Sequence, residues 1–432
     1  MRTIKRLLLF LCLSPLFVLA DNVTITGRVN RPETLVRLMI CDDLLNMSET
    51  LVAETYSDDK GFFILEGSVS QTLPGAIYVG LESVDLVVSP GAAYEVAITI
   101  PEQDPTASYF DRLSPTLRVK TASDKGLYRQ LVLSEDIISG YVLNYFDEIY
   151  RRRQVRYLDS IRMAIQAEVG TVCEYVAHEN DYRIAAVQMA LNADGGQKVI
   201  RDYYDGKPVL YHCQAYMDLF KDLFKNYESN DAFKERNPRL AEMIAIYQLR
   251  TAYYNETPRY RGAIRQRIQA IKDKTNYAET KKMVGNMLKR FDKFAPGAPA
   301  TDFELKDMAG NTVKLSDYKN TVVVLQFLEG TSRTVEHQLE ELADFVKQWQ
   351  GHVQLITITT KDQAANWQRR FEAHHYDWPL LNLGNDILLL EHYEVLTFPE
   401  YFIINKGTKI GMAPAPSPDQ TLGDYVQGML EK

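Results

Sequence analysis

The chain has 432 residues, of which 46% are hydrophobic and 25% are charged, and its formal net charge is −8. This composition is typical of globular proteins, and the length suffices for about two to four domains. Because nucleic-acid binding usually needs a basic face, the acidic balance disfavours a nucleic-acid partner.

Residues 1–20 have the pattern of a secretory signal peptide. Arg2, Lys5 and Arg6 form a basic start, and the apolar run Leu7–Leu19 is too short to span a bilayer comfortably. Cleavage is expected after the small residue Ala20, and an uncleaved anchor is the alternative. No later apolar run is long enough to cross a membrane. We therefore predict an exported protein of the periplasm or cell envelope, or a secreted one, without a transmembrane segment after signal removal.

The cysteines do not indicate a disulfide framework. Cys12 lies in the signal and follows Leu11, where a lipoprotein signal needs a small residue, so lipidation is disfavoured. Cys41, Cys173 and Cys213 remain, an odd number of widely separated residues outside any Cys-x-x-Cys motif. We expect them to be small buried apolar groups, and the sequence leaves a redox role for one of them open.

Strand-like runs separated by turn signals occupy residues 21–105. Val23–Val29 alternates, Thr34–Ile40 is largely apolar, and Phe62–Leu65 follows the turn Ser57–Gly61. Turns at this spacing predict a small antiparallel β sandwich.

In residues 106–292 glycine is sparse, and polar and apolar residues recur periodically over long stretches. Asn237 followed by Pro238 is a helix-start signal, and apolar residues from Leu240 to Tyr247 then recur at helical spacing. We predict an α-helical region that joins the two flanking domains.

One clear linker follows at residues 293–301, where Pro296, Gly297 and Pro299 cluster. The predicted organisation is a signal peptide at 1–20, a β sandwich at 21–105, a helical region at 106–292, the linker, and an α/β domain at 302–432.

Residues 302–432 alternate between strand and helix patterns. Thr321–Phe327 is a nearly unbroken apolar run, typical of a central strand buried on both faces. In the next helix, apolar residues from Val335 to Trp349 fall on one face. Later strands are predicted at Val353–Thr359 and Glu400–Ile404, which gives a β-α-β unit followed by a β-β-α unit.

Several motifs resemble those of secreted thioredoxin-like reductases and peroxiredoxins. They are the first strand at 297–305, the Val-x-Leu-Ser-Asp segment at Val313–Asp317, and Phe398-Pro399 at the position of a cis-proline. Asp59–Phe62 and Val88–Gly91 resemble the β domain that precedes thioredoxin domains in secreted proteins of Bacteroidetes-type bacteria. The resemblance implies an α/β thioredoxin-like C-terminal domain, preceded by an all-β sandwich and an α-helical middle region.

The same resemblance places the redox motif, and both of its cysteines are absent. Counting from Phe327, the nucleophilic position falls on Ser332 and the resolving position on Val335. A thiolate is needed to attack a disulfide or a peroxide, and a serine without an adjacent base does not replace it. Ser332 is instead expected to be the N-cap of the following helix. No catalytic residue is therefore assigned.

In redox-active relatives, the surface between this helix start and the cis-proline holds a peptide. Here that groove should comprise Leu328, Thr331, Ser332, Phe398 and Pro399. Because adjacent exposed Leu and Phe side chains are unfavourable in water, we expect a cover, either from the helical region or from a partner.

The sequence leaves two functions open. One is a non-catalytic binding or assembly module of the bacterial envelope, with a protein or peptide partner that the sequence does not identify. The alternative is a thiol-disulfide oxidoreductase that uses a cysteine from outside the motif, such as Cys213. Adjacent His374 and His375 at a helix end should point apart, so we expect no metal site. We also expect no cofactor. Whether a cysteine lies within reach of Ser332 discriminates between the two functions.

Overall fold

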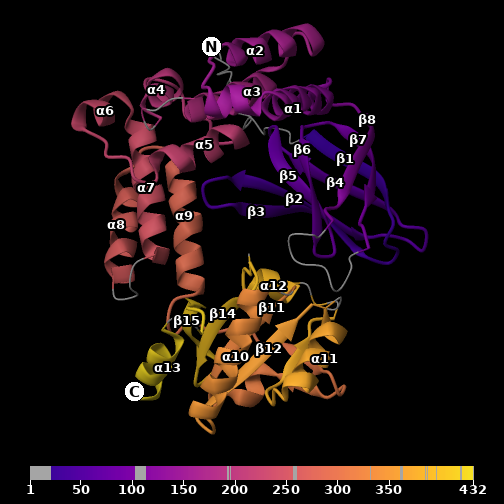
Figure 1. The fold of residues 1–432 in the computed structure, drawn as a ribbon, viewed down its shortest axis with the longest axis vertical. Helices are drawn as coiled ribbons and strands as arrows, with labels where there is room; N and C mark the ends of the chain where they lie inside the picture. Colours follow the sequence, from indigo (N-terminus) through magenta and orange to yellow (C-terminus); the bar gives the residue numbers. More distant parts are fainter. Residues whose placement is uncertain are drawn as a thin grey trace, which may run out of the picture.

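The computed structural model describes residues 21–102, 113–191, 194, 196–255, 260–330, 332–360, 363–384, 386, 388–395, 397–418 and 421–431. The predicted signal peptide, with Cys12, lies outside them. In Figure 1 an all-β part (indigo to purple) and a helical part (magenta to salmon) lie side by side above an α/β domain (orange to yellow). The predicted fold class, all-β then α-helical then α/β, is confirmed.

Two four-stranded sheets form the sandwich, in the orders β4-β1-β7-β8 and β3-β2-β5-β6. Apolar side chains that alternate inward along the strands, such as Val23, Ile25, Leu38 and Ile77, form its core. The strands are β1 (Asp21–Val29), β2 (Leu35–Asp43), β3 (Ser48–Tyr56), β4 (Phe62–Val69), β5 (Leu73–Val79), β6 (Glu82–Val88), β7 (Ala93–Thr99) and β8 (Thr116–Ala122).

Two features of the sandwich differ from the sequence prediction. β1 runs parallel to β7, so the sandwich is mixed rather than purely antiparallel. β8 pairs with β7, which extends the β structure beyond residue 105 into the segment predicted to be helical. Only Leu117 and Val119 of β8 pack against the core, so this edge strand carries a weak apolar signal.

The helical part has two cores: α1 and α2 pack with α3 in an aliphatic cluster, and the helices from α3 to α9 pack around an aromatic and methionine-rich one. Its α-helix α7 begins at Pro238, as predicted. None of the described helices is long and apolar enough to cross a membrane. The helices are α1 (Leu127–Asn144), α2 (Arg156–Glu168), α3 (Glu174–Leu191), α4 (Gln197–Val199), α5 (Gln214–Phe224), α6 (Asp231–Arg236), α7 (Pro238–Asn255), α8 (Arg261–Lys274) and α9 (Ala278–Lys293), with π-helical turns at Asp147–Arg151 and Ile200–Tyr204.

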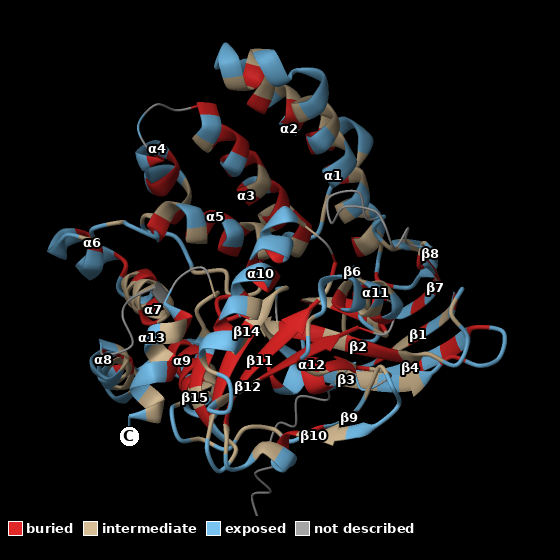
Figure 2. Cartoon of the chain, turned by 60° about the horizontal axis from the view of Figure 1, so that its bottom comes forward, coloured by how far each residue is buried: buried red, intermediate tan, exposed pale blue. Residues whose placement is uncertain are grey.

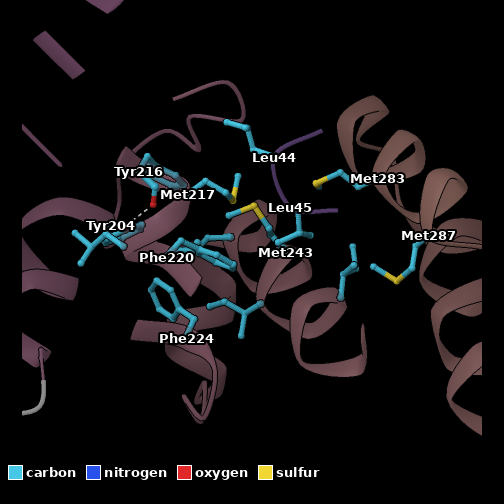
Figure 3. Packing of buried hydrophobic residues seen from close by; sticks show 14 of the residues in the cluster. Leu44, Leu45, Tyr204, Tyr216, Met217, Phe220, Phe224, Met243, Met283 and Met287 are labelled. Atoms are coloured by element: carbon cyan, nitrogen blue, oxygen red, sulfur yellow. Dashed lines mark hydrogen bonds between the residues drawn. The ribbon is translucent and has the colours of Figure 1, made fainter. Parts of the chain in front are cut away.

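The β2–β3 hairpin of the sandwich inserts its tip into this helical core. Leu44 and Leu45 are 1% and 0% exposed and belong to the helical cluster, not to the sandwich core. Figure 3 shows them between Met217 and Met243 on one side and Met283 of α9 on the other. The sandwich and the helical region therefore share a hydrophobic core.

Polar contacts fix the hairpin tip beside these leucines. Asp43 is buried and accepts hydrogen bonds from the side-chain amides of Asn46, at 2.8 Å, and Asn286 of α9, at 2.9 Å. Asn46 also donates to the Met283 carbonyl oxygen at 2.9 Å. Lys282 pairs with Asp42 at 2.7 Å. Because buried polar groups are costly without partners, these bonds favour a single register of the hairpin against α9.

The α/β domain is built on a seven-stranded sheet in the order β10-β9-β13-β12-β11-β14-β15. Its centre, β11, pairs in parallel with β12 and antiparallel with β14, and all of its residues are buried, as the red strands of Figure 2 show. The elements are β9 (Glu304–Asp307), β10 (Thr312–Lys314), β11 (Val322–Leu328), α10 (Arg333–Gln348), β12 (Val353–Thr359), α11 (Ala364–His374), β13 (Leu380–Asn382), α12 (Leu388–His392), β14 (Glu400–Asn405), β15 (Lys409–Ala415) and α13 (Leu422–Leu430), with a 3-10 turn at Leu315–Tyr318.

The two faces of this sheet have separate cores. Helices α10, α11 and α13 cover one face, where they pack on Val322, Val324 and Leu328. Helix α12 lies on the other face, against Val323 and Phe327. This alternation follows from the two-residue period of a strand.

Ion pairs from the α12 region connect the α/β domain to the rest of the chain. Glu391 of α12 pairs with Arg37 of β2, whose side chain is only 5% exposed. Glu394, just after α12, pairs with Arg290 of α9 at 2.6 Å and with Lys293 at 3.1 Å. The α/β domain is thus held to the sandwich and to the helical region by two neighbouring glutamates.

Replacement of Leu45 by Ala should destabilise the sandwich and the helical region together. The substitution leaves a cavity in their shared core, which typically costs about 2–5 kcal/mol. Leu51→Ala on β3 is the control, because Leu51 is 46% exposed and its truncation should cost less than about 0.5 kcal/mol. Denaturant unfolding measures both values, and equal stability of the two variants would contradict the shared core.

Glu394→Gln should loosen the α/β domain without unfolding it. Glu394 is 27% exposed and pairs with two cations, so its loss should weaken docking by about 1–3 kcal/mol. Hydrogen–deuterium exchange of α12 should then become faster. The matched control is Glu95→Gln, which breaks an exposed pair with Lys120 and should leave exchange in α12 unchanged. Identical hydrogen–deuterium exchange of α12 in the two variants would contradict a role of the Glu394 ion pairs in docking the α/β domain.

Candidate binding site at the edge of the α/β sheet

Ser332 lies where β11 passes into α10, and its hydroxyl has a structural partner. Its Oγ accepts a hydrogen bond from the Val335 backbone N–H at 3.2 Å, so the prediction of a helix N-cap is confirmed. Val335 is 4% exposed and packs in the core under α10. Thr331, the residue before Ser332, lies outside the described residues.

The described surroundings of Ser332 do not include an activating base in contact with it. His337, on the same helix, faces Glu340 and Glu341 at 3.9 and 3.8 Å and is well exposed. A serine nucleophile needs a base within hydrogen-bond reach. The arrangement that the structure describes therefore caps a helix and supplies no activated nucleophile.

A buried polar network anchors α10 to the sheet beneath it. Gln326 of β11 is fully buried; it donates to the Tyr401 hydroxyl at 3.0 Å and accepts from the Thr357 hydroxyl at 2.8 Å. Tyr401 in turn donates to Gln338 of α10 at 3.0 Å. Trp378 donates to Thr357 at 3.0 Å. Such a satisfied network fixes the helix start relative to β11 and β14.

The Phe398–Pro399 peptide bond is cis and directly precedes β14. Because Glu400 lies opposite Phe327 in the β11–β14 register, this loop flanks the end of β11. Phe398 is partly buried against the core on the α12 face.

The predicted pairing of Leu328 with Phe398 in one exposed groove is wrong. Leu328 is 0% exposed and packs on the α10 face, whereas Phe398 packs on the α12 face. The last residue of β11 still follows the strand alternation, so its side chain points into the core rather than into the groove. Of these two side chains, only Phe398 packs on the α12 side.

Phe398 instead lines a cavity of about 750 Å³, which we call the interdomain cavity. It lies between β2, β3 and β5 of the sandwich, α9, and the α12 region with Glu329, the residue directly after β11. Three of its apolar lining residues are methionines, Met39, Met47 and Met287. Residues of the sandwich and of α9 therefore line the same cavity as Phe398, and the cover over this side chain stays a prediction.

Charged residues on the cavity wall are largely paired with one another. Arg37 lies over the Tyr78 ring, 5.6 Å from its centroid, besides pairing with Glu391. The Tyr78 hydroxyl donates to Glu49 at 3.0 Å. Burial raises the pKa of both groups; the Glu49 charge raises that of Tyr78 further, and the Tyr78 hydrogen bond opposes the rise for Glu49. The wall is thus polar but nearly charge-balanced.

The described cysteines lie away from this site. None of Cys41, Cys173 and Cys213 lines the interdomain cavity, and all three are free thiols. Cys41 and Cys213 are buried in the helical core; burial raises the pKa of Cys41 to about 12 and raises that of Cys213 further. Cys173 is exposed just before α3, a helix that lies near the top of Figure 1, whereas α10 lies near the bottom. The buried thiols therefore resist becoming thiolates.

Sequence reasoning missed the charged residues that frame the cavity. Arg37 and Glu391 are 354 positions apart, so no local pattern joins them. Arg290 lies on α9 and Glu394 in the turn after α12, where charges usually face solvent. The described residues contain no group of three or more His, Cys, Asp and Glu side chains placed to hold a metal ion.

Comparisons with known proteins concern the C-terminal domain. The AhpC/TSA family model matches residues 296–412. A search of the curated proteins gave no match. A thiol:disulfide interchange protein from Bacteroides sp. is 20% identical, over 32% of this chain and 93% of its own, with a TM-score of 0.30.

Two further solved structures are similar to a comparable share of this chain. The thioredoxin domain of a thiol-disulfide oxidoreductase from Bacteroides vulgatus is 22% identical, over 31% of this chain and 98% of its own, with a TM-score of 0.28. An exposed lipoprotein thioredoxin from Streptococcus pneumoniae is 24% identical, over 29% of this chain and 99% of its own, with a TM-score of 0.25. The strand order and the matched family model together make the C-terminal domain of this chain thioredoxin-like.

Proposed function

We propose that this chain is an exported protein of the bacterial envelope whose thioredoxin-like domain binds a protein or peptide partner instead of exchanging thiols. The observation that carries the proposal is at the start of α10. Ser332 and Val335 stand at Cys-x-x-Cys spacing, and they serve as a helix cap and a core side chain. The chain has no cysteine after residue 213, so this domain has no thiol of its own.

The interdomain cavity supports a binding role at the same edge of the sheet. Its methionines are flexible and polarizable, which suits contact with apolar side chains of varied shape. Its paired charges, such as Arg37 with Glu391, can exchange partners with a polar backbone or side chain. At about 750 Å³ it has room for a few residues of a peptide.

A thiol-disulfide oxidoreductase remains the alternative function, and it requires Cys41, Cys173 or Cys213 to reach Ser332. The two buried thiols have raised pKa values, and the exposed Cys173 lies in the helical part. An oxidoreductase would therefore need a large rearrangement of the parts that the hairpin and the α12 ion pairs hold together. The geometry favours the binding role.

Phe398→Asp should abolish capture of the partner. The substitution places a charge on the apolar part of the cavity wall, which disfavours burial of a partner's apolar group. Tagged protein would be crosslinked in envelope fractions, and the captured species identified by mass spectrometry. The matched control is Phe62→Asp, because Phe62 is 51% exposed on β4 and does not line the cavity.

Circular dichroism must show that both variants are folded. A species captured by the wild type and by Phe62→Asp, but not by Phe398→Asp, supports the proposal. Equal capture by all three proteins would show that the partner binds a surface other than this cavity.

A further inference from the structure

A second cavity, of about 260 Å³, lies where the helical region meets the thioredoxin-like sheet. Helices α7 and α9 form one side, and β14, β15 and the loop before β14 form the other. We call it the aromatic cavity, because six of its lining residues are aromatic: Tyr253, Tyr254, Phe291, Phe294, Tyr393 and Phe402. It shares the Arg290–Glu394 ion pair with the interdomain cavity but includes neither Ser332 nor Phe398.

The aromatic walls hold one another in place. The rings of Tyr253 and Phe291 are stacked with centroids 3.6 Å apart, and Tyr254 meets Phe291 edge to face at 5.9 Å. On the sheet side, Tyr393 and Phe402 pack at 5.1 Å. Because an apolar cavity of about 150 Å³ can hold benzene, this larger one has room for a ring and a small polar group.

Arg250 places a positive charge on the cavity wall, and the described part of the chain supplies no ion-pair partner for it. It lies over the Tyr254 ring, 5.8 Å from its centroid, and is half-buried. No carboxylate of the described residues lies within ion-pair distance of it, whereas the neighbouring Arg290 pairs with Glu394 at 2.6 Å. Burial lowers the pKa of Arg250, and the Arg290 charge lowers it further. Partial burial of a guanidinium without an anionic partner costs desolvation free energy. An anionic ligand would offset that cost by pairing with Arg250.

We propose that the aromatic cavity binds a group that combines one aromatic ring with one carboxylate. The ring would pack among the aromatic walls, and the carboxylate would accept hydrogen bonds from the Arg250 guanidinium. Glu394 and Glu400 also line the cavity, which disfavours a doubly charged phosphate. The ligand is either a free aromatic acid or the C-terminal residue of a peptide, and this site is independent of the proposed function.

The test is isothermal titration calorimetry of the mature chain with three probes. They are 3-phenylpropionate, a short glycine peptide that ends in phenylalanine with a free carboxylate, and the same peptide with an amidated end. We expect saturable binding of one or both acids and none of the amide. Binding of 3-phenylpropionate alone identifies a free acid as the ligand source, and binding of the acidic peptide identifies a C-terminus.

Arg250→Met should weaken binding about tenfold or more, because a charge-assisted bidentate contact is lost. Arg239→Met is the matched control; it removes an exposed arginine at the other end of α7 and should leave the affinity unchanged. Thr397→Trp provides a second variant, since Thr397 is an exposed lining residue and its enlargement should block the cavity while Arg250 remains.

Three results would overturn the proposal. They are the absence of saturable binding of both acids to the wild type, equal binding of the acidic and amidated peptides, and wild-type affinity in folded Arg250→Met or Thr397→Trp protein.

Discussion

The arrangement of the whole chain depends on where the β2–β3 hairpin is held. Its tip places Leu44 and Leu45 in the helical core, and Asp43 accepts hydrogen bonds from Asn46 and Asn286 beside them. The same strand carries Arg37, which pairs with Glu391 of the thioredoxin-like domain. A single strand therefore contacts both other parts of the molecule. Because the shared core is apolar and close-packed, the sandwich cannot shift against the helices without opening a void.

The interdomain cavity follows from this arrangement. The hairpin sets the distance between the sandwich and α9, and the glutamates of the α12 region attach the third domain across the gap. The end of β11 and the loop before β14 thus face the interdomain cavity. Ser332 caps α10, and Gln326, Tyr401 and Gln338 anchor that helix to the sheet.

Much of this architecture could be predicted from local patterns. The apolar run of β11, the amphipathic face of α10 and the Asn237-Pro238 helix start each reflect a short-range constraint. The N-cap role of Ser332 was equally local. By contrast, β8 has too few inward apolar residues to stand out, and the parallel pairing of β1 with β7 depends on the path of the chain.

The candidate site was less predictable than the fold. The position of Leu328 next to the motif predicts that it lines a groove, but strand alternation turns its side chain into the core. Arg37 and Arg290 derive their roles from partners on distant segments, and no spacing rule reveals these partners. The sequence of the hairpin tip predicts a turn between two strands. No local pattern indicates that this turn is buried among helices.

Our central proposal is that the thioredoxin-like domain does not exchange thiols, because Ser332 and Val335 stand at Cys-x-x-Cys spacing at the start of α10. The most direct measurement compares insulin reduction by dithiothreitol in the presence of the wild type, the Cys213→Ser variant and the double variant Ser332→Cys, Val335→Cys. The account predicts that the wild type and Cys213→Ser are no faster than a serum-albumin control. The double variant should gain activity, because a cysteine at the start of α10 has a lowered pKa. Wild-type turnover that Cys213→Ser abolishes would contradict the account.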